Sequence, residues 1–141
     1  MKQTLSVLAC VAAVLLMVTG CGKGSGDGNN VELDDVFANM NPAKNTKLHS
    51  TEYWKGVEGK DVKSSANVVG VQGRRNYAEI LVLRRNDTPS NGKHNMVLLV
   101  PDIAKAAELK VGQSIRFTGT LSEYRITHGD NVIITIKNAS M

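Results

Sequence analysis

Two segments in the last third of the chain carry an apolar residue at every second position. These residues are Ile115, Phe117 and Leu121 in the first segment and Val132, Ile134 and Ile136 in the second. A period of two places successive side chains on opposite faces of a β-strand, so both segments predict strands with one buried face. Gly119 falls on the buried side of the first, where glycine allows a barrel strand to bend.

Three further β-rich segments precede these two. Residues 62–71 predict a long strand bent near its glycine, residues 77–83 a second strand, and residues 96–100 a third that is continuously apolar. A turn at 73–76 and a loop at 86–92 separate them. Pro101 then suits the first position of a short helix. The predicted order is three strands, one short helix and two strands.

This order matches the OB-fold, a five-stranded Greek-key barrel. Residues 109–121, Leu-Lys-Val-Gly-Gln-Ser-Ile-Arg-Phe-Thr-Gly-Thr-Leu, resemble the fourth-strand region of exported bacterial OB-fold proteins, including those grouped as anticodon-binding-like. The resemblance implies a mostly β domain over residues 54–141, with the helix between strands three and four. Another small barrel or an open antiparallel sheet is the alternative.

The first 21 residues have the features of an export signal. A basic start at Lys2 is followed by an apolar stretch from Leu5 to Val18, which is shorter than the about 20 residues that span a bilayer as a helix. The ending Val18-Thr19-Gly20-Cys21 resembles the lipobox of bacterial lipoproteins. The resemblance implies that residues 1–20 are a cleaved signal peptide and that Cys21 carries lipid. An uncleaved anchor helix is the alternative.

A lipidated Cys21 predicts a location at the cell envelope. Two or more acyl chains, such as palmitate, anchor a protein stably without any transmembrane segment. Because Gly22 and not aspartate follows the cysteine, the resemblance implies sorting to the periplasmic face of the outer membrane in a Gram-negative host. Val7-Leu8-Ala9-Cys10 fits the same pattern, but it lies too close to Lys2 to leave room for an apolar core.

The segment between the lipid and the barrel has two parts. Residues 21–30 are rich in glycine and predict a flexible tether. Residues 31–53 predict a short helix over 31–40, ended by Pro42, and then a connection. Leu33, Phe37 and Met40 share one face of that helix. This face can dock on the barrel, bind a partner or stay free, and the sequence leaves these alternatives open.

Composition limits the mature chain to one domain without a disulfide. Removal of residues 1–20 leaves 121 residues whose only cysteine is Cys21. It also removes Lys2, which leaves 16 basic and 13 acidic residues and a net charge of +3. This mild excess falls short of the basic face expected of a dedicated nucleic-acid binder.

The chain shows no spacing that indicates catalysis, a metal or a cofactor. The three histidines, His49, His94 and His128, lie far apart and lack partners at metal-ligand spacing. There is no phosphate-binding glycine loop and no Ser-His-Asp or Cys-His grouping. We therefore expect a protein that is not an enzyme, holds no metal or cofactor and has no small-molecule substrate.

Two loops and one strand end contain candidate binding residues. OB-folds bind ligands on the face of strands two and three, between the loops that join strands one to two and four to five. The candidate residues are Arg74, Arg75, Tyr77, Arg84, Tyr124 and Arg125. Arginine beside an aromatic ring binds phosphate, carboxylate, sugar or a base. Alternatively, these residues lie in turns only because turns face water.

The sequence therefore predicts a membrane-anchored lipoprotein with a non-catalytic OB-fold binding module. Its expected partner is an envelope or secretion-apparatus protein. Binding of an anionic polymer, either nucleic acid or an envelope glycan, is the alternative, although one Trp, three Tyr and two Phe provide few rings for base stacking. A third possibility makes the barrel a spacer and the 31–40 segment the contact.

Overall fold

The computed structural model describes residues 28–87 and 93–141. The predicted signal peptide, Cys21 and most of the tether lie outside these residues. The described elements are α1 (Leu33–Met40), α2 (Lys47–Val57), β1 (Asp61–Gly73), β2 (Ala78–Arg84), β3 (Met96–Val100), α3 (Ile103–Ala107), β4 (Ser114–Thr127) and β5 (Asn131–Ser140). Among them, no helix has the length and apolar character needed to cross a membrane.

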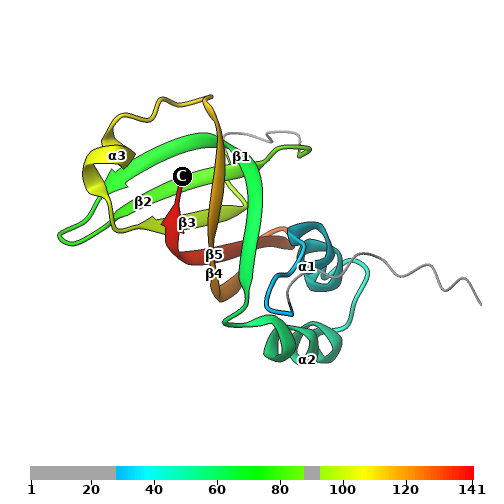
Figure 1. The fold of residues 1–141 in the computed structure, drawn as a ribbon. Coiled ribbons are helices and arrows are strands. Elements are labelled where there is room, and N and C mark those ends of the chain that lie inside the picture. The colour runs from blue at the N-terminus through cyan, green and yellow to red at the C-terminus, as the bar shows by residue number, and fades with distance from the viewer. Residues whose placement is uncertain (1–27, 88–92) are drawn as a thin grey trace, which may run out of the picture.

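The five strands form a closed barrel in the order β1-β2-β3-β5-β4. Every neighbouring pair is antiparallel except β3 and β5, which run parallel. The helix α3 connects β3 to β4, while α1 and α2 lie together at the other end of the barrel (Figure 1). This strand order and helix position are those of an OB-fold, so the predicted fold class is confirmed.

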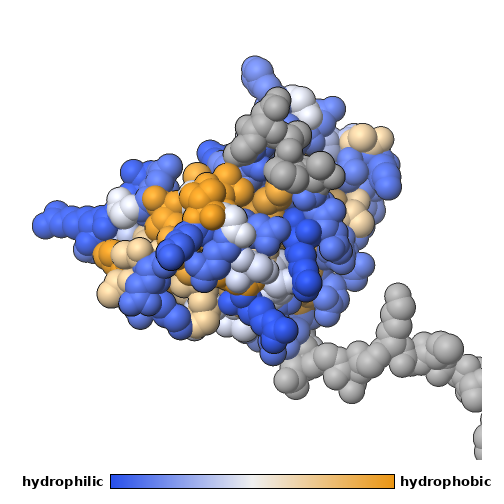
Figure 2. All heavy atoms as spheres, turned by 90° about the horizontal axis from the view of Figure 1, so that it is seen from above, coloured by the Kyte–Doolittle hydropathy of each residue, from blue (hydrophilic) through white to orange (hydrophobic). Residues whose placement is uncertain are grey.

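The barrel interior is filled by the alternating apolar residues. Those predicted to face inward on β4 and β5 are at most 8% exposed. They pack with inward residues of the other strands, including Ile80, Val82, Met96 and Leu98. On the outer surface, seen from above, hydrophobic residues gather in one area and hydrophilic residues surround it (Figure 2).

The strand β1 closes the barrel because it pairs with two neighbours. Its first half, Asp61 to Asn67, pairs with β4, and its second half, Ala66 to Gly73, pairs with β2. The pairing with β2 shifts register between Val68 and Gly70, as expected for a strand bent near its glycine.

The helix α1 docks on the barrel. Its buried residues Leu33, Val36 and Met40 belong to the same apolar core as the strands. Of the three alternatives left open for this segment, docking is the observed one. Asn29 and Val31 also form backbone hydrogen bonds with Asp61, so the expected tether ends before residue 30.

The helix α2 corrects the prediction that residues 43–53 are a connection and that the β domain begins at Trp54. The hydroxyl of Thr46 caps the helix by accepting a hydrogen bond from the His49 backbone nitrogen at 3.2 Å. The helix then buries Trp54 and Val57 in the core. Its Ser50 hydroxyl donates to the Asn39 carbonyl oxygen of α1 at 3.0 Å, which joins the two helices.

We predict that Gly119→Ala lowers the free energy of unfolding by about 1–3 kcal/mol, because the barrel leaves no room for a side chain there. A Cβ at Gly119 would lie 2.5 Å from Cγ2 of Ile136 and 3.0 Å from the Lys137 carbonyl oxygen. Urea unfolding measures the change. Gly73→Ala is the control, since no described atom beyond its chain neighbours lies within 4 Å of its Cβ position. Equal stability of the two variants would contradict the prediction.

Candidate binding face

The outer surface of β2 and β3 is apolar at the position where OB-folds bind ligands. Leu81 of β2 pairs with Val97 of β3, and Leu99 is the next residue of β3 on the same outward face. We call these three residues the aliphatic face. Val97 is 8% exposed, whereas Leu81 and Leu99 are half-buried. Gly70 of β1 pairs with Leu81 and adds no side chain, so the leucine stays accessible from that side.

Polar and charged residues border the aliphatic face on two sides. Glu79, which pairs with Leu99, accepts a hydrogen bond from Nη2 of Arg74 at 2.9 Å. This contact lowers the pKa of Glu79 below its ordinary value. On the other side Thr135 pairs with Val97, and its hydroxyl donates to Glu123 at 3.3 Å. The face is therefore a short apolar strip between two polar edges.

The structure brings only some of the predicted binding residues to this face. Arg74, Arg75 and Tyr77 lie in the exposed hairpin between β1 and β2. Arg125 lies on the outward side of β4, paired with Ile133 of β5. In the part of the chain that the structure describes, Arg125 has no carboxylate within ion-pair distance.

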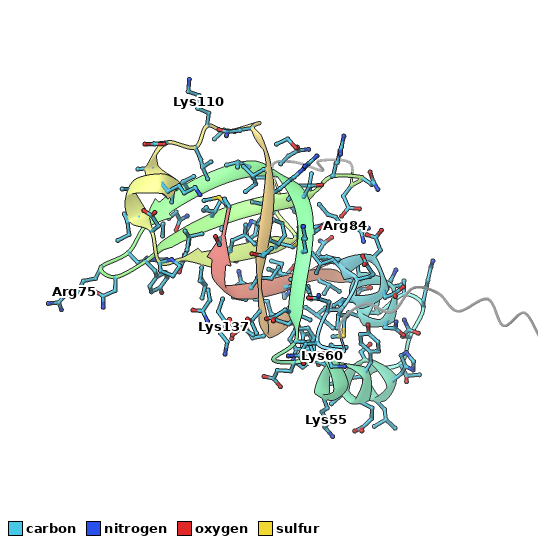
Figure 3. All side chains as sticks on the ribbon, viewed as in Figure 1. Lys55, Lys60, Arg75, Arg84, Lys110 and Lys137 are labelled. Carbon is cyan, nitrogen blue, oxygen red and sulfur yellow. The ribbon has the colours of Figure 1, made fainter. Side chains whose placement is uncertain are left out.

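Arg84 lies at the opposite end of β2 from Arg75 (Figure 3). Its Nε and Nη2 donate to the carboxylate of Asp87 at 3.2 and 2.8 Å, and its Nη1 donates to Asp34 at 3.2 Å. The guanidinium also lies 4.7 Å from the centre of the Phe37 ring. Because Asp34 and Phe37 belong to α1, Arg84 connects this helix to the barrel.

Tyr124 points inward and not toward a ligand surface. It pairs with the buried Ile134, and its ring centre lies 5.0 Å from that of Trp54, at a tilted angle of 57°. Such tilted ring pairs stabilise packing beyond the area they bury. Tyr124 therefore holds α2 against the barrel.

His94 lies just before β3 and is half-buried. Its Nε2 is buried and has no hydrogen-bond partner among the described residues. Burial lowers the pKa of His94 below its ordinary value, and the positive charge of Arg125 lowers it further.

The aliphatic residues were not predicted as binding residues. The signal in the sequence was the continuously apolar segment 96–100, which places apolar side chains on both faces of its strand. One face fills the barrel and the other faces outward.

The described residues bring no three metal-ligating side chains together.

No protein-family model and no curated protein matches the chain. Among solved structures, a "putative nucleic acid-binding lipoprotein" from Klebsiella pneumoniae is 16% identical, with a TM-score of 0.45 over 79% of this chain and 88% of that one. A replication protein A heterotrimer bound to ssDNA contains a chain 15% identical, with a TM-score of 0.35 over 57% of this chain and 55% of that one. The OB-fold assignment therefore depends on the strand order of the barrel itself.

We predict that Tyr124→Ala lowers the free energy of unfolding by about 2 kcal/mol, because it removes a half-buried ring that packs on Trp54. Tyr77→Ala is the matched control, since Tyr77 is exposed in the hairpin. Thermal and urea unfolding measure both variants. If both variants lower the free energy of unfolding by the same amount, Tyr124 does not hold α2 in place.

We predict that the stability of the protein falls as the pH drops below about 6.5, the ordinary pKa of histidine. The folded pKa of His94 is lowered, so the unfolded chain binds the proton first and the stabilisation present above that pH is lost. His94→Phe should flatten this part of the stability profile. His128→Gln, at an exposed hairpin position, should leave it unchanged. If His94→Phe has the same dependence of stability on pH as the parent chain, His94 is not the residue responsible.

Proposed function

We propose that this chain is a lipid-anchored, non-catalytic OB-fold module of the cell envelope, and that its aliphatic face binds a protein partner. The observation that carries the proposal is the apolar surface of the half-buried Leu81 and Leu99 beside the buried Val97 on β2 and β3. This is the surface that the fold uses for binding in other proteins.

An aliphatic strip favours a protein over nucleic acid. Burial of apolar area yields roughly 25 cal/mol per Å², which a partner with its own apolar side chains can use. OB-folds that bind single strands instead stack bases on aromatic rings, and the aliphatic face has none. Arg74, the basic residue beside it, is already paired with Glu79.

The charges around the strip indicate the kind of protein segment that fits. Arg125 on β4 and Arg75 in the hairpin have no ion-pair partner within the described ranges. We infer a partner segment in which aliphatic side chains lie between acidic ones. The aliphatic side chains cover the strip and the carboxylates meet the two arginines, which also speeds association at low salt.

The lipid anchor is the second part of the proposal. The ending Val18-Thr19-Gly20-Cys21 supports lipidation of Cys21 and, in a Gram-negative host, location at the periplasmic face of the outer membrane. An anchored module meets partners that lie within or beside the same membrane. Envelope and secretion-apparatus proteins are therefore the expected class.

We predict that a photo-crosslinking residue at Leu99 captures a recurrent protein adduct in living cells. The same residue at Lys63, on the outward side of β1, is the control and should capture little. Leu81→Glu should abolish the Leu99 adduct, because it places a charge in the centre of the apolar contact. Mass spectrometry identifies the adduct and membrane fractionation follows the protein.

Cys21→Ser completes this experiment, because it removes the sulfur that accepts the lipid. It should release the protein from the membrane fraction and reduce the adduct. Adducts with nucleic acid in place of protein, or equal protein capture from Leu99 and Lys63, would reject the proposed partner class. Unchanged membrane partitioning of Cys21→Ser would reject the anchor.

A further inference from the structure

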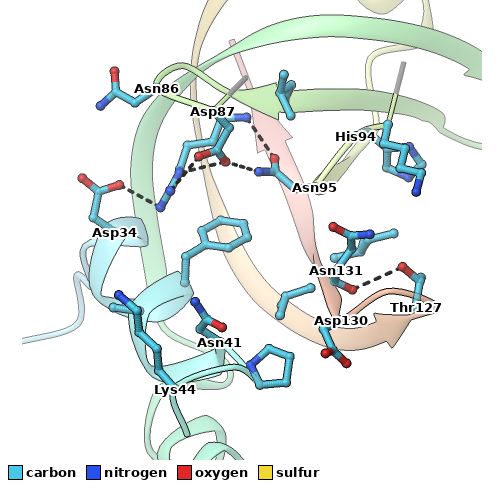
Figure 4. A pocket seen from close by; sticks show the side chains of 18 residues that line it. Asp34, Asn41, Lys44, Asn86, Asp87, His94, Asn95, Thr127, Asp130 and Asn131 are labelled. Atoms are coloured by element: carbon cyan, nitrogen blue, oxygen red, sulfur yellow. Dashed lines mark hydrogen bonds and ion pairs between the residues drawn. The ribbon is translucent and has the colours of Figure 1, made fainter. Parts of the chain in front are cut away.

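A cleft of about 810 Å³ lies between α1 and the adjacent end of the barrel (Figure 4). Its apolar surface comes from Phe37 of α1, Leu83 of β2 and Val132 and Ile133 of β5. Leu83 and Ile133 are 7% and 6% exposed. The volume lies within the range of small-ligand sites, which combine an apolar surface with a few polar groups.

Amide side chains from three separate parts of the chain line the cleft. Asn41 follows α1, Asn86 follows β2 and Asn131 begins β5. Asn86 makes no hydrogen bond to any described residue. Within the same part of the chain, the Asn131 side chain bonds only to the His128 carbonyl oxygen, at 3.4 Å. Each amide both donates and accepts hydrogen bonds, so the cleft offers both kinds of group.

His94 supplies a separate indication that a ligand belongs here. Its Nε2 is buried without a hydrogen-bond partner in the part of the molecule that is described, and the residue lines the cleft. A buried polar atom without a partner costs free energy, and a bound hydroxyl group would satisfy it once the imidazole turns this nitrogen toward the cleft. The neutral imidazole can either donate to such a hydroxyl or accept from it.

The charges of the cleft do not favour an ion. Arg84 pairs with the carboxylates of both Asp34 and Asp87, which leaves one net negative charge at this end. The remaining charges are two lysines, Lys44 and Lys93, and the carboxylate of Asp130. A ligand of either sign would meet a like charge among these three residues.

The closed barrel also disfavours an extended peptide. Peptides that bind to sheets add a strand to an exposed edge. The walls of the cleft include β2, β4 and β5, and each of these strands has a neighbour on both sides. Within the described residues, the backbone of Asn95 bonds to Val82 and Ile134 at this end of the barrel. Only residues 131–133 of β5 lie beyond its pairs with β3, so a peptide could add a strand over three residues at most.

We infer that the cleft between α1 and the barrel binds an uncharged carbohydrate, a short oligosaccharide whose hydroxyls meet the amides of Asn86 and Asn131 and the imidazole of His94. The apolar C–H faces of the sugar rings lie against Leu83, Val132 and Ile133. This site is separate from the aliphatic face of Leu81, Val97 and Leu99, and it does not depend on the proposed protein partner.

Titration of the full-length chain by ¹H–¹⁵N NMR tests this inference. The protein is kept in dodecylphosphocholine micelles, because that headgroup carries no sugar. The probes are maltotriose, cellotriose and triacetylchitotriose, with polyphosphate and acetyl-trialanine amide as comparisons. We expect at least one trisaccharide to bind with a Kd on the order of 1 mM and to shift the amide signals of His94 and Asn131.

Two variants locate the site, and a third variant at a distant position serves as the control. Asn131→Ala and His94→Phe should each weaken trisaccharide binding by about tenfold, the effect of one lost hydrogen bond. Asn76→Ala, in the exposed hairpin at the far end of β2, should bind as the parent chain does. Spectra of each variant without sugar show whether the fold is retained.

Three results would overturn the inference. The first is the absence of saturable shifts with every trisaccharide in the folded parent chain. The second is tighter binding of polyphosphate or the blocked peptide than of any sugar. The third is sugar binding that folded Asn131→Ala and His94→Phe both retain unchanged, since that would place the ligand elsewhere.

Discussion

The pairing of β1 with both β2 and β4 determines the rest of this structure. Residues 66–73 belong to one side of the barrel and residues 61–67 to the other, so β1 must bend between them. The register shift at Val68 and Gly70 accommodates that bend. Once β1 closes the ring, β3 must lie beside β5 in parallel, and the outward side chains of β2 and β3 form one continuous face.

The barrel was predictable because its signal is local. The strands β4 and β5 carry a period-two pattern, and β3 is continuously apolar. Gly119 was expected to let β4 bend, and it lies where a side chain would meet Ile136. The helix α2 has no comparable signal. Its sequence mixes Lys, His, Ser, Thr and Glu with few apolar residues, and Trp54 resembles a strand residue by propensity. The local helix signal is the Thr46 cap, and the burial of Trp54 in the core beside Tyr124 is a tertiary contact that the sequence does not show.

The binding surface expected from the sequence stays a prediction, and the structure places its candidate residues in different surroundings. Arg74 lies beside the aliphatic face, where it pairs with Glu79. Arg84 instead pairs with Asp87 and with Asp34, which lies 50 residues earlier in the chain. Sequence spacing cannot reveal that a cation already has a carboxylate from a distant element. The same limit applies to Leu81 and Leu99, whose outward orientation follows from barrel closure and not from their local pattern.

The two surfaces lie on adjoining parts of the barrel, and Arg125 connects them electrostatically. At the aliphatic face, the hydrogen bond from Arg74 is the main cause that lowers the pKa of Glu79. At the cleft, burial is the main cause that lowers the pKa of His94. The charge of Arg125 lowers both pKa values further. A partner carboxylate that pairs with Arg125 would weaken its field at His94. Under the proposed function, a partner on the aliphatic face would therefore change the protonation equilibrium of His94 in the cleft without any movement of the backbone.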